Sequence, residues 1–165
     1  MKRALLVLAA CLLVSAPAMA REKGHGGPKG VENKGKQVIA TQDAPPAIGP
    51  YSQAIRVGGL LFISGSLGMD PASGQIAAGG IATETEQALN NLGAILKAAG
   101  GTFDDIVKTT IFLTDMADFK TVNELYAKRF SSAPPARSTV AVKELPRNGK
   151  VEIEAIAFVP RQKKQ

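Results

Sequence analysis

The sequence predicts one α+β domain, in which a mixed six-stranded sheet carries two helices on one face, in the order β-β-β-α-β-α-β-β. Three observations support this prediction. The chain has 165 residues, which suits a single domain. Hydrophobic residues make up 45% of it and charged residues 21%, which is enough apolar material for a core. Short β-branched runs bounded by glycine and proline accompany two segments of helical periodicity.

The first strands lie before and around a glycine pair. Residues 38–40 predict a short strand, and a proline-rich loop follows it. Residues 52–57 and 60–64 flank Gly58-Gly59, and two strand-like runs around a two-residue turn indicate a hairpin. Ser64-Gly65-Ser66 then marks the end of the second strand of this hairpin.

Residues 81–99 form the clearest predicted helix. Apolar residues recur there at helical spacing, and Gly100-Gly101 gives the stop signal. Residues 106–113 are rich in β-branched side chains and predict a strand. Asp118 is placed to cap a second helix from residue 119 to about residue 130. The side chains expected to face inward from this helix are Phe119, Val122, Leu125 and Tyr126.

The last two strands are predicted at residues 138–142 and 151–159, after Pro134-Pro135 breaks the helix. Strand–helix–strand connections are right-handed, so both helices are expected on one face of the sheet. The chain then has no element left to cover the other face. Because the final strands are too apolar for full exposure, we expect oligomerisation.

The first 20 residues have the pattern of a secretory signal peptide. Met1-Lys2-Arg3 is basic, residues 4–16 are almost wholly apolar, and Ala18-Met19-Ala20 has the small-x-small pattern that signal peptidase reads. The apolar run of about 13 residues is shorter than the roughly 20 that a membrane span needs. Cys11 comes too early for a lipoprotein signal. We therefore predict cleavage after Ala20, a periplasmic or secreted location, and no membrane span.

The positive charge of the mature chain is predicted to lie in two tails. Residues 21–36, a flexible glycine-rich leader, hold five basic and two acidic residues, and the tail 161–165 holds three basic residues. The domain itself, residues 37–160, holds 10 basic and 12 acidic residues. A nucleic-acid-binding module carries its basic stripe on the folded surface, so we expect no nucleic-acid partner.

The residue counts exclude several classes of site. The single Cys, Cys11, and the single His, His25, both precede the predicted domain. Residues 37–160 therefore lack the base of a Ser-His-Asp or Cys-His nucleophile and the usual ligands of zinc. We expect no metal, and acid–base chemistry must use Asp, Glu, Tyr, Lys, Arg or water.

Two features of the last strands are candidates for chemistry. Glu152 and Glu154 alternate with apolar residues and point to one face, where desolvation favours the protonated form or a nearby cation. The alternative is a solvent-facing edge on which the two charges oppose aggregation. Arg137 opens a strand and is well placed to fork onto a carboxylate ligand, although an ordinary surface arginine would have the same pattern.

Six short motifs, each weak alone, occur in one order between residues 38 and 160. They are GPYSQA (49–54), ISG (63–65), IVKTTIFLTD (106–115), VNELY (122–126), PARS (135–138) and VEIEAIA (151–157). Together they closely resemble the RidA (YjgF) family of reactive-intermediate imine deaminases. The resemblance implies a chorismate-mutase-like α+β fold and a homotrimer with an active site at each subunit interface. It also implies hydrolysis of 2-imino acids and enamines, such as 2-aminoacrylate, to 2-keto acids and ammonia without a metal or organic cofactor.

The same resemblance implies roles for residues within these motifs. Arg137 would hold the substrate carboxylate, and Glu152 would position or deprotonate the attacking water. Thr139 would offer backbone groups to the imine nitrogen and carbonyl region. The residues that would line and shape the pocket are Tyr51, Ser64 and Asn123. Thr139 stands where some members have Cys, and Ser66 where many have Gln.

Other functions stay open at this point. A non-catalytic protein would keep the pocket to bind small carboxylates and would release no ammonia. A holdase chaperone, an activity that some relatives gain after chlorination by oxidants, would use the lysine-rich tails in the envelope. A nuclease role, proposed for relatives, ranks last because the predicted domain is slightly acidic. The export signal also separates this chain from the cytosolic pyridoxal-phosphate enzymes that are the familiar source of 2-aminoacrylate.

Overall fold

The computed structural model describes residues 35–160. The predicted signal peptide, almost all of the leader and the C-terminal tail lie outside these described residues. Within them there are six strands, two α-helices and three 3-10 helices. In chain order they are β1 (Lys36–Ile39), β2 (Ala54–Val57), β3 (Leu60–Leu67), α1 (Ile81–Ala98), η1 (Phe103–Asp105), β4 (Ile106–Leu113), η2 (Met116–Asp118), α2 (Phe119–Ala127), β5 (Ala136–Ala141), η3 (Pro146–Asn148) and β6 (Val151–Phe158). The predicted order of strands and helices is confirmed.

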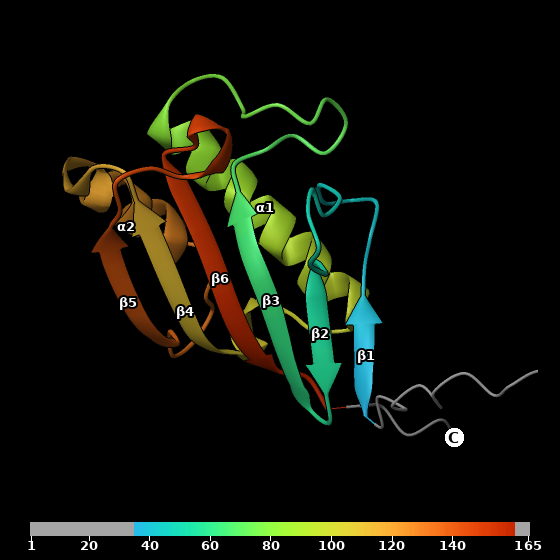
Figure 1. The fold of residues 1–165 in the computed structure, drawn as a ribbon. Helices are drawn as coiled ribbons and strands as arrows, with labels where there is room; N and C mark the ends of the chain where they lie inside the picture. The colour runs from blue at the N-terminus through green and yellow to red at the C-terminus, as the bar shows by residue number, and fades with distance from the viewer. Residues whose placement is uncertain (1–34, 161–165) are drawn as a thin grey trace, which may run out of the picture. The chain divides into compact units, whose positions relative to one another are not determined.

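The strands form one mixed sheet in the order β1-β2-β3-β6-β4-β5. β4 and β5 are parallel, and every other neighbouring pair is antiparallel. Both helices lie behind the sheet in the view of Figure 1, which confirms that they share one face. The predicted hairpin is present, with Val57 opposite Leu60 across Gly58-Gly59. Gly58 has a φ of 60°, which glycine adopts without strain.

The core lies between the sheet and the helices. Alternate residues of β6 face the helices and are buried, namely Val151, Ile153, Ala155 and Ala157. α1 packs against β3 and β6 and presents a stripe of fully buried leucines, Leu89, Leu92 and Leu96. Burying one such leucine stabilises the fold by about 1.5–3 kcal/mol, so this layer fixes the position of β6 and of the glutamates on its other face.

β3 extends beyond its predicted end. The expected stop at Ser64-Gly65-Ser66 is wrong, because the strand passes through this segment as a β-bulge and continues to Leu67. Ile63 pairs with Ala155 and Ser66 pairs with Ile153, so β3 advances one residue more than β6 between the two pairs. A bulge redirects the side chains around it, and this one lies beside the central strand of the sheet.

The second helix also differs from its prediction. α2 is shorter than expected, and Asp118 occupies its N-cap position without making a side-chain capping bond. Asp115 does this work one turn earlier, where its carboxylate accepts a hydrogen bond from the Ala117 backbone N–H at 2.8 Å in η2. Phe119, expected in the core, is the first residue of α2 and is 38% exposed.

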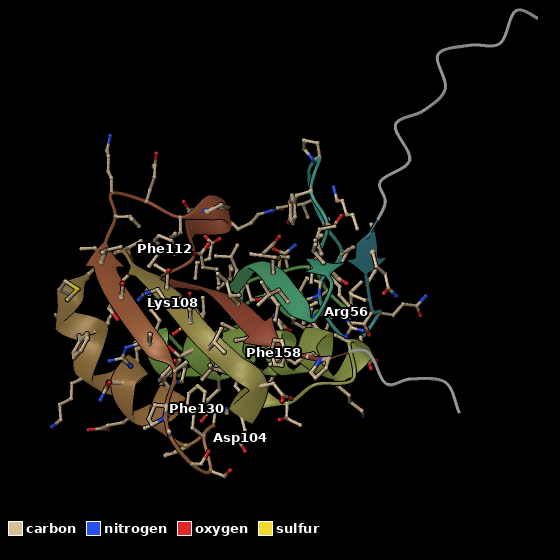
Figure 2. The ribbon with its side chains drawn as sticks, turned by 90° about the horizontal axis from the view of Figure 1, so that it is seen from below. Arg56, Asp104, Lys108, Phe112, Phe130 and Phe158 are labelled. Atoms are coloured by element: carbon tan, nitrogen blue, oxygen red, sulfur yellow. The ribbon has the colours of Figure 1, made fainter. Side chains whose placement is uncertain are left out.

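The face of the sheet opposite the helices carries large apolar side chains that no described element covers. They are Phe62, Phe112, Val140, Ile156 and Phe158. Phe112 and Phe158 are labelled in Figure 2, and Phe158 is 53% exposed. This arrangement agrees with the uncovered apolar face expected from the sequence. Among the residues that the structure describes, no helix combines the length and the apolar character needed to cross a bilayer.

Candidate active site

Arg137 lies near the start of β5, on the face of the sheet that packs against α2. Its Nη2 donates a hydrogen bond to Asn123 Oδ1 of α2 at 2.8 Å. Its guanidinium carbon lies 4.9 Å from the ring centroid of Tyr126 and 5.7 Å from that of Phe119. Three residues of one helix therefore hold a half-buried arginine in place.

The guanidinium of Arg137 has donors to spare for a ligand. Within residues 35–160, no carboxylate lies within 4.0 Å of it, and its Nε and Nη1 donate to no acceptor. A hollow of about 340 Å³ lies beside it, lined by Asn123, Tyr126, Ala127, Phe130, Pro134, Pro135 and Arg137. A planar cationic fork at the wall of a mostly apolar hollow suits a small organic carboxylate.

Thr139 follows Arg137 on the same face of β5. Because β5 pairs in parallel with β4, Arg137 lies opposite Thr109 and Thr139 lies opposite Ile111. The Oγ1 atom of Thr139 is buried and has no hydrogen-bond partner in the described chain. A buried, unpaired hydroxyl costs about 1–3 kcal/mol, and this one is enclosed by the chain itself.

Glu152 lies on the opposite face of the sheet, in the central strand β6. Its side chain crosses Gly65 of the bulge so closely that a Cβ atom on Gly65 would overlap the carboxylate. Burial, and then the negative charge of Glu154, raise the pKa of Glu152 above its usual value of 4.5. A carboxylate with a raised pKa accepts a proton more readily than an ordinary glutamate, as a general base requires.

A second hollow, of about 240 Å³, opens beside Glu152. It is lined by Ile48, Tyr51, Ser64, Gly65, Leu67, Pro146 and Glu152. Two hydrogen bonds shape its wall: Ser64 Oγ donates to the Ser52 carbonyl at 2.7 Å, and the Ile48 N–H donates to Tyr51 Oη at 3.2 Å. The loop before β2 and the bulge of β3 thus bring Tyr51 and Ser64 next to Glu152.

The two glutamates of β6 have different surroundings. The residue pattern alone did not distinguish them, and the family resemblance assigned the site to Glu152. Glu154 is exposed and lines a separate hollow with Phe62, Lys108 and Thr110. Glu152 alone shares a hollow with Tyr51 and Ser64. Across residues 35–160, no three His, Cys, Asp or Glu side chains gather where they could hold a metal ion.

Within one chain, the residues expected at the site form two groups on opposite faces of the sheet. We call them the arginine half, which is Arg137, Asn123 and Thr139, and the glutamate half, which is Tyr51, Ser64 and Glu152. A single chain therefore does not bring Arg137 and Glu152 to one pocket. A site that uses both groups needs a second chain.

Two residues that the sequence analysis did not assign to the site contribute to its geometry. Gly65 has the features of a strand end in the sequence, and Tyr126 has those of a core residue. A glycine inside a strand pattern also indicates a bulge or a close approach, which is the signal for Gly65. The signal for Tyr126 is its spacing of three from Asn123, which places both side chains on one helix face.

The sequence is similar to known proteins over most of its described length. The family model described as Endoribonuclease L-PSP matches residues 41–159. A 2-iminobutanoate/2-iminopropanoate deaminase of Bos taurus is 56% identical over 122 residues, which are 74% of this chain and 89% of the bovine protein.

Solved structures share the fold. A Rid family protein of unknown function from Yersinia pestis has a TM-score of 0.73 at 49% identity, and the match covers 75% of this chain and 99% of that one. TdcF of E. coli, solved with bound serine, has a TM-score of 0.71 at 43% identity, covering 74% of this chain and 98% of the other. Both halves of the candidate site lie inside the matched family region.

Proposed function

Because this chain belongs to the endoribonuclease L-PSP (RidA/YjgF) family, we propose that it is a hydrolytic deaminase of 2-imino acids. Its substrates are short 2-imino acids, such as 2-iminobutanoate and 2-iminopropanoate, and enamine tautomers such as 2-aminoacrylate. Its products are the 2-keto acids and ammonia. The observation that carries this proposal is 56% identity over 122 residues with a bovine protein named for that activity.

In this proposal the arginine half binds the substrate carboxylate. Arg137 uses N–H donors that have no protein acceptor in the described chain, and Asn123 holds the guanidinium in place through its hydrogen bond. Thr139 offers its backbone groups to the imine end of the substrate. The serine bound to TdcF, itself a small molecule with a carboxylate, supports a ligand of this size and kind.

The glutamate half positions and activates the attacking water. Glu152 removes a proton from a water molecule while the water oxygen bonds to C2 of the protonated imine (C=NH2⁺) and the C=N π electrons move to nitrogen, which gives a neutral carbinolamine. The proton on Glu152 then passes to the amino nitrogen. The C2–N bond breaks as the Glu152 carboxylate takes the proton of the C2 hydroxyl, which becomes the keto group; ammonia leaves, and Glu152 releases its proton to solvent. Proton transfer by one positioned carboxylate contributes about 10²–10⁴-fold.

We further propose that the site forms between chains of a homotrimer. The arginine half of one chain would meet the glutamate half of the next, and the two halves together would form one complete site. The uncovered apolar face of the sheet supports this, because residues such as Phe62, Ile156 and Phe158 are too apolar for permanent exposure.

Ammonia release by the purified protein tests the activity. Imino acids are generated in place from several amino acids by an amino acid oxidase, and Arg137→Ala runs in parallel. We expect acceleration above the spontaneous rate in the wild type and its loss in the variant. Saturable binding of 2-oxobutanoate without any acceleration would replace the deaminase with a carboxylate-binding protein.

Mixed oligomers test the shared site. Arg137→Ala and Glu152→Gln chains, each inactive alone, are unfolded and refolded together in equal amounts. In a trimer with sites between chains, about a quarter of the sites would then combine an intact Arg137 with an intact Glu152, and activity returns to about that fraction. If both residues served one chain's own site, mixing would restore nothing.

We also propose that the chain is exported, on the evidence of residues 1–20, which lie outside the described residues. N-terminal sequencing of the protein recovered from the periplasm or the medium tests this. We expect a first residue of Arg21. Recovery in the cytoplasm with residues 1–20 intact would contradict export. The lysine-rich tails on which a chaperone role would depend also lie outside the described residues.

A further inference from the structure

We propose that Phe119 and Tyr126 are positioning residues that clamp Arg137 in the orientation needed to fork a carboxylate. This inference rests on the proposed function, since it assumes that Arg137 binds the substrate. Helix α2 then has a role in substrate binding, which neither the residue types of Phe119 and Tyr126 nor their burial alone indicates.

The contacts of Arg137 come from one stripe of α2. Phe119, Asn123 and Tyr126 are spaced four and three residues apart, so they follow one another along a single face of the helix. All three contact the guanidinium: Asn123 through a hydrogen bond of 2.8 Å, and the two rings with centroids 4.9 and 5.7 Å from its central carbon. Both ring distances lie within the roughly 6 Å range of cation–π attraction.

The Tyr126 ring is fixed by its own hydroxyl. Its Oη lies 2.7 Å from Thr109 Oγ1, a buried hydrogen bond to the residue that pairs with Arg137 across β4 and β5. Phe130 packs against the ring at a centroid distance of 4.8 Å, and Tyr126 is only 3% exposed. Burial raises the pKa of the phenol above its usual 10.0, so Tyr126 stays neutral beside the cation.

This clamp reduces the entropy lost on binding. An unconstrained arginine side chain loses rotamer entropy when a ligand immobilises it, and that loss weakens the affinity for the ligand. Here α2 immobilises the side chain in advance. The rings attract the positive charge of the guanidinium without accepting its N–H groups, and Asn123 accepts one Nη2 proton. Nε and Nη1 therefore stay available to a carboxylate.

The test measures the affinity for 2-oxobutanoate, a product of the proposed reaction, together with the order parameter of the Arg137 Nε–H by NMR. The Nε signal is assigned by its absence in Arg137→Ala. We expect Tyr126→Leu to weaken binding about 5–30-fold and to lower the order parameter. Tyr126→Phe loses the hydrogen bond to Thr109 but keeps the ring and its packing on Phe130, so it should weaken binding less, by at most about threefold.

Two further variants separate positioning from general damage. Phe119→Leu alters a side chain that is 38% exposed, so it should fold, and we expect binding weaker by about 2–5-fold with a lower Nε order parameter. Phe103→Leu removes a partly buried ring that contacts Phe130 and Arg129 but not Arg137, and should change neither quantity.

The outcomes are distinguishable. Wild-type affinity and order parameter in both Phe119→Leu and Tyr126→Leu would overturn the clamp and leave the proposed function intact. Equal weakening by Phe103→Leu would show a general loss of structure and would also overturn it. Wild-type binding by Arg137→Ala would remove the carboxylate role of Arg137, and with it both the proposed site and the clamp.

Discussion

The two halves of the candidate site are positioned by opposite means. In the arginine half, side chains of α2 contact Arg137 from several sides, through one hydrogen bond and two aromatic rings. In the glutamate half, Glu152 lies where a side chain is missing, over Gly65 at the bulge of β3. Attraction therefore orients the cation, and available space orients the carboxylate.

This difference predicts different responses to mutation. A residue held by several contacts loses its position gradually, since each contact contributes a small part. A residue held by the shape of a narrow space loses its position at once when that space is filled, because packed atoms cannot overlap. The glutamate half should therefore show the larger and sharper effects.

The largest effect is expected at Glu152 itself. Glu152→Gln removes the base and should lower kcat/KM about 10²–10⁴-fold, whereas the exposed Glu154→Gln should stay within about threefold of the wild type. Because burial disfavours the charged form of Glu152, the same Gln variant should also melt at a higher temperature near neutral pH.

Ammonia-release kinetics and thermal melts of both variants measure these two changes. A Glu152→Gln variant with wild-type activity would remove the base from the glutamate half. Loss of activity in Glu154→Gln, but not in Glu152→Gln, would exchange the roles of the two residues.

The next effect is expected from filling the space at Gly65. Gly65→Ala places a methyl group where the Glu152 carboxylate lies, and a displacement of about 1 Å in a catalytic group can reduce the rate about 100-fold. We expect a loss of about 10–100-fold in kcat/KM with little change in the affinity for 2-oxobutanoate, which the arginine half provides.

Gly74→Ala is the matched control for this prediction. Gly74 has a φ of 68° with open space around it, so alanine there should destabilise the fold by about 1–2 kcal/mol and leave activity unchanged. A Gly65→Ala enzyme that is less stable but fully active would show that Glu152 does not depend on this space.

Sequence periodicity predicted the element order and the single face shared by Glu152 and Glu154, because each strand and helix has one apolar face. It did not predict the bulge, since Gly65 between two serines has the local features of a strand end. The register that makes it a bulge is set by pairing with β6, far along the chain. For the same reason the strand pattern alone did not distinguish Glu152 from Glu154, and only the family resemblance assigned the role to Glu152.

The contacts of the arginine half were also beyond the sequence. Helical spacing correctly predicted a buried Tyr126, but the arginine above it comes from β5, which reaches α2 only through the parallel pairing with β4. The apolar character of Phe119 predicted a place in the core. Its ring lies instead against Arg137. Periodicity identifies the apolar face of a helix or strand, but it does not identify which residues of other elements pack on that face.

A pair of threonines sharpens the comparison within the arginine half. Thr139 Oγ1 is buried without a partner in the described chain, whereas Thr109 Oγ1 shares a hydrogen bond with Tyr126. Thr139→Val should therefore keep or raise stability and leave 2-oxobutanoate binding within about twofold of the wild type, and Thr109→Val should lower stability by about 1–3 kcal/mol. Denaturant unfolding and calorimetric titration measure both. A destabilised Thr139→Val would instead indicate that this hydroxyl makes a hydrogen bond in the folded protein.

The smallest effect is expected in the pH dependence of the glutamate half. Glu154 is the second cause of the raised pKa of Glu152, so Glu154→Gln should lower that pKa toward 4.5. Glu152 acts as a base only when deprotonated, and the acid limb of kcat/KM should therefore move to lower pH. A folded-state pKa above the unfolded one means that stability falls as pH rises between the two values, and this fall should be smaller in the variant. The affinity of the arginine half for 2-oxobutanoate should be unchanged, because Glu154 lies on the opposite face of the sheet. If the acid limb of kcat/KM does not move, the group that titrates there is not Glu152.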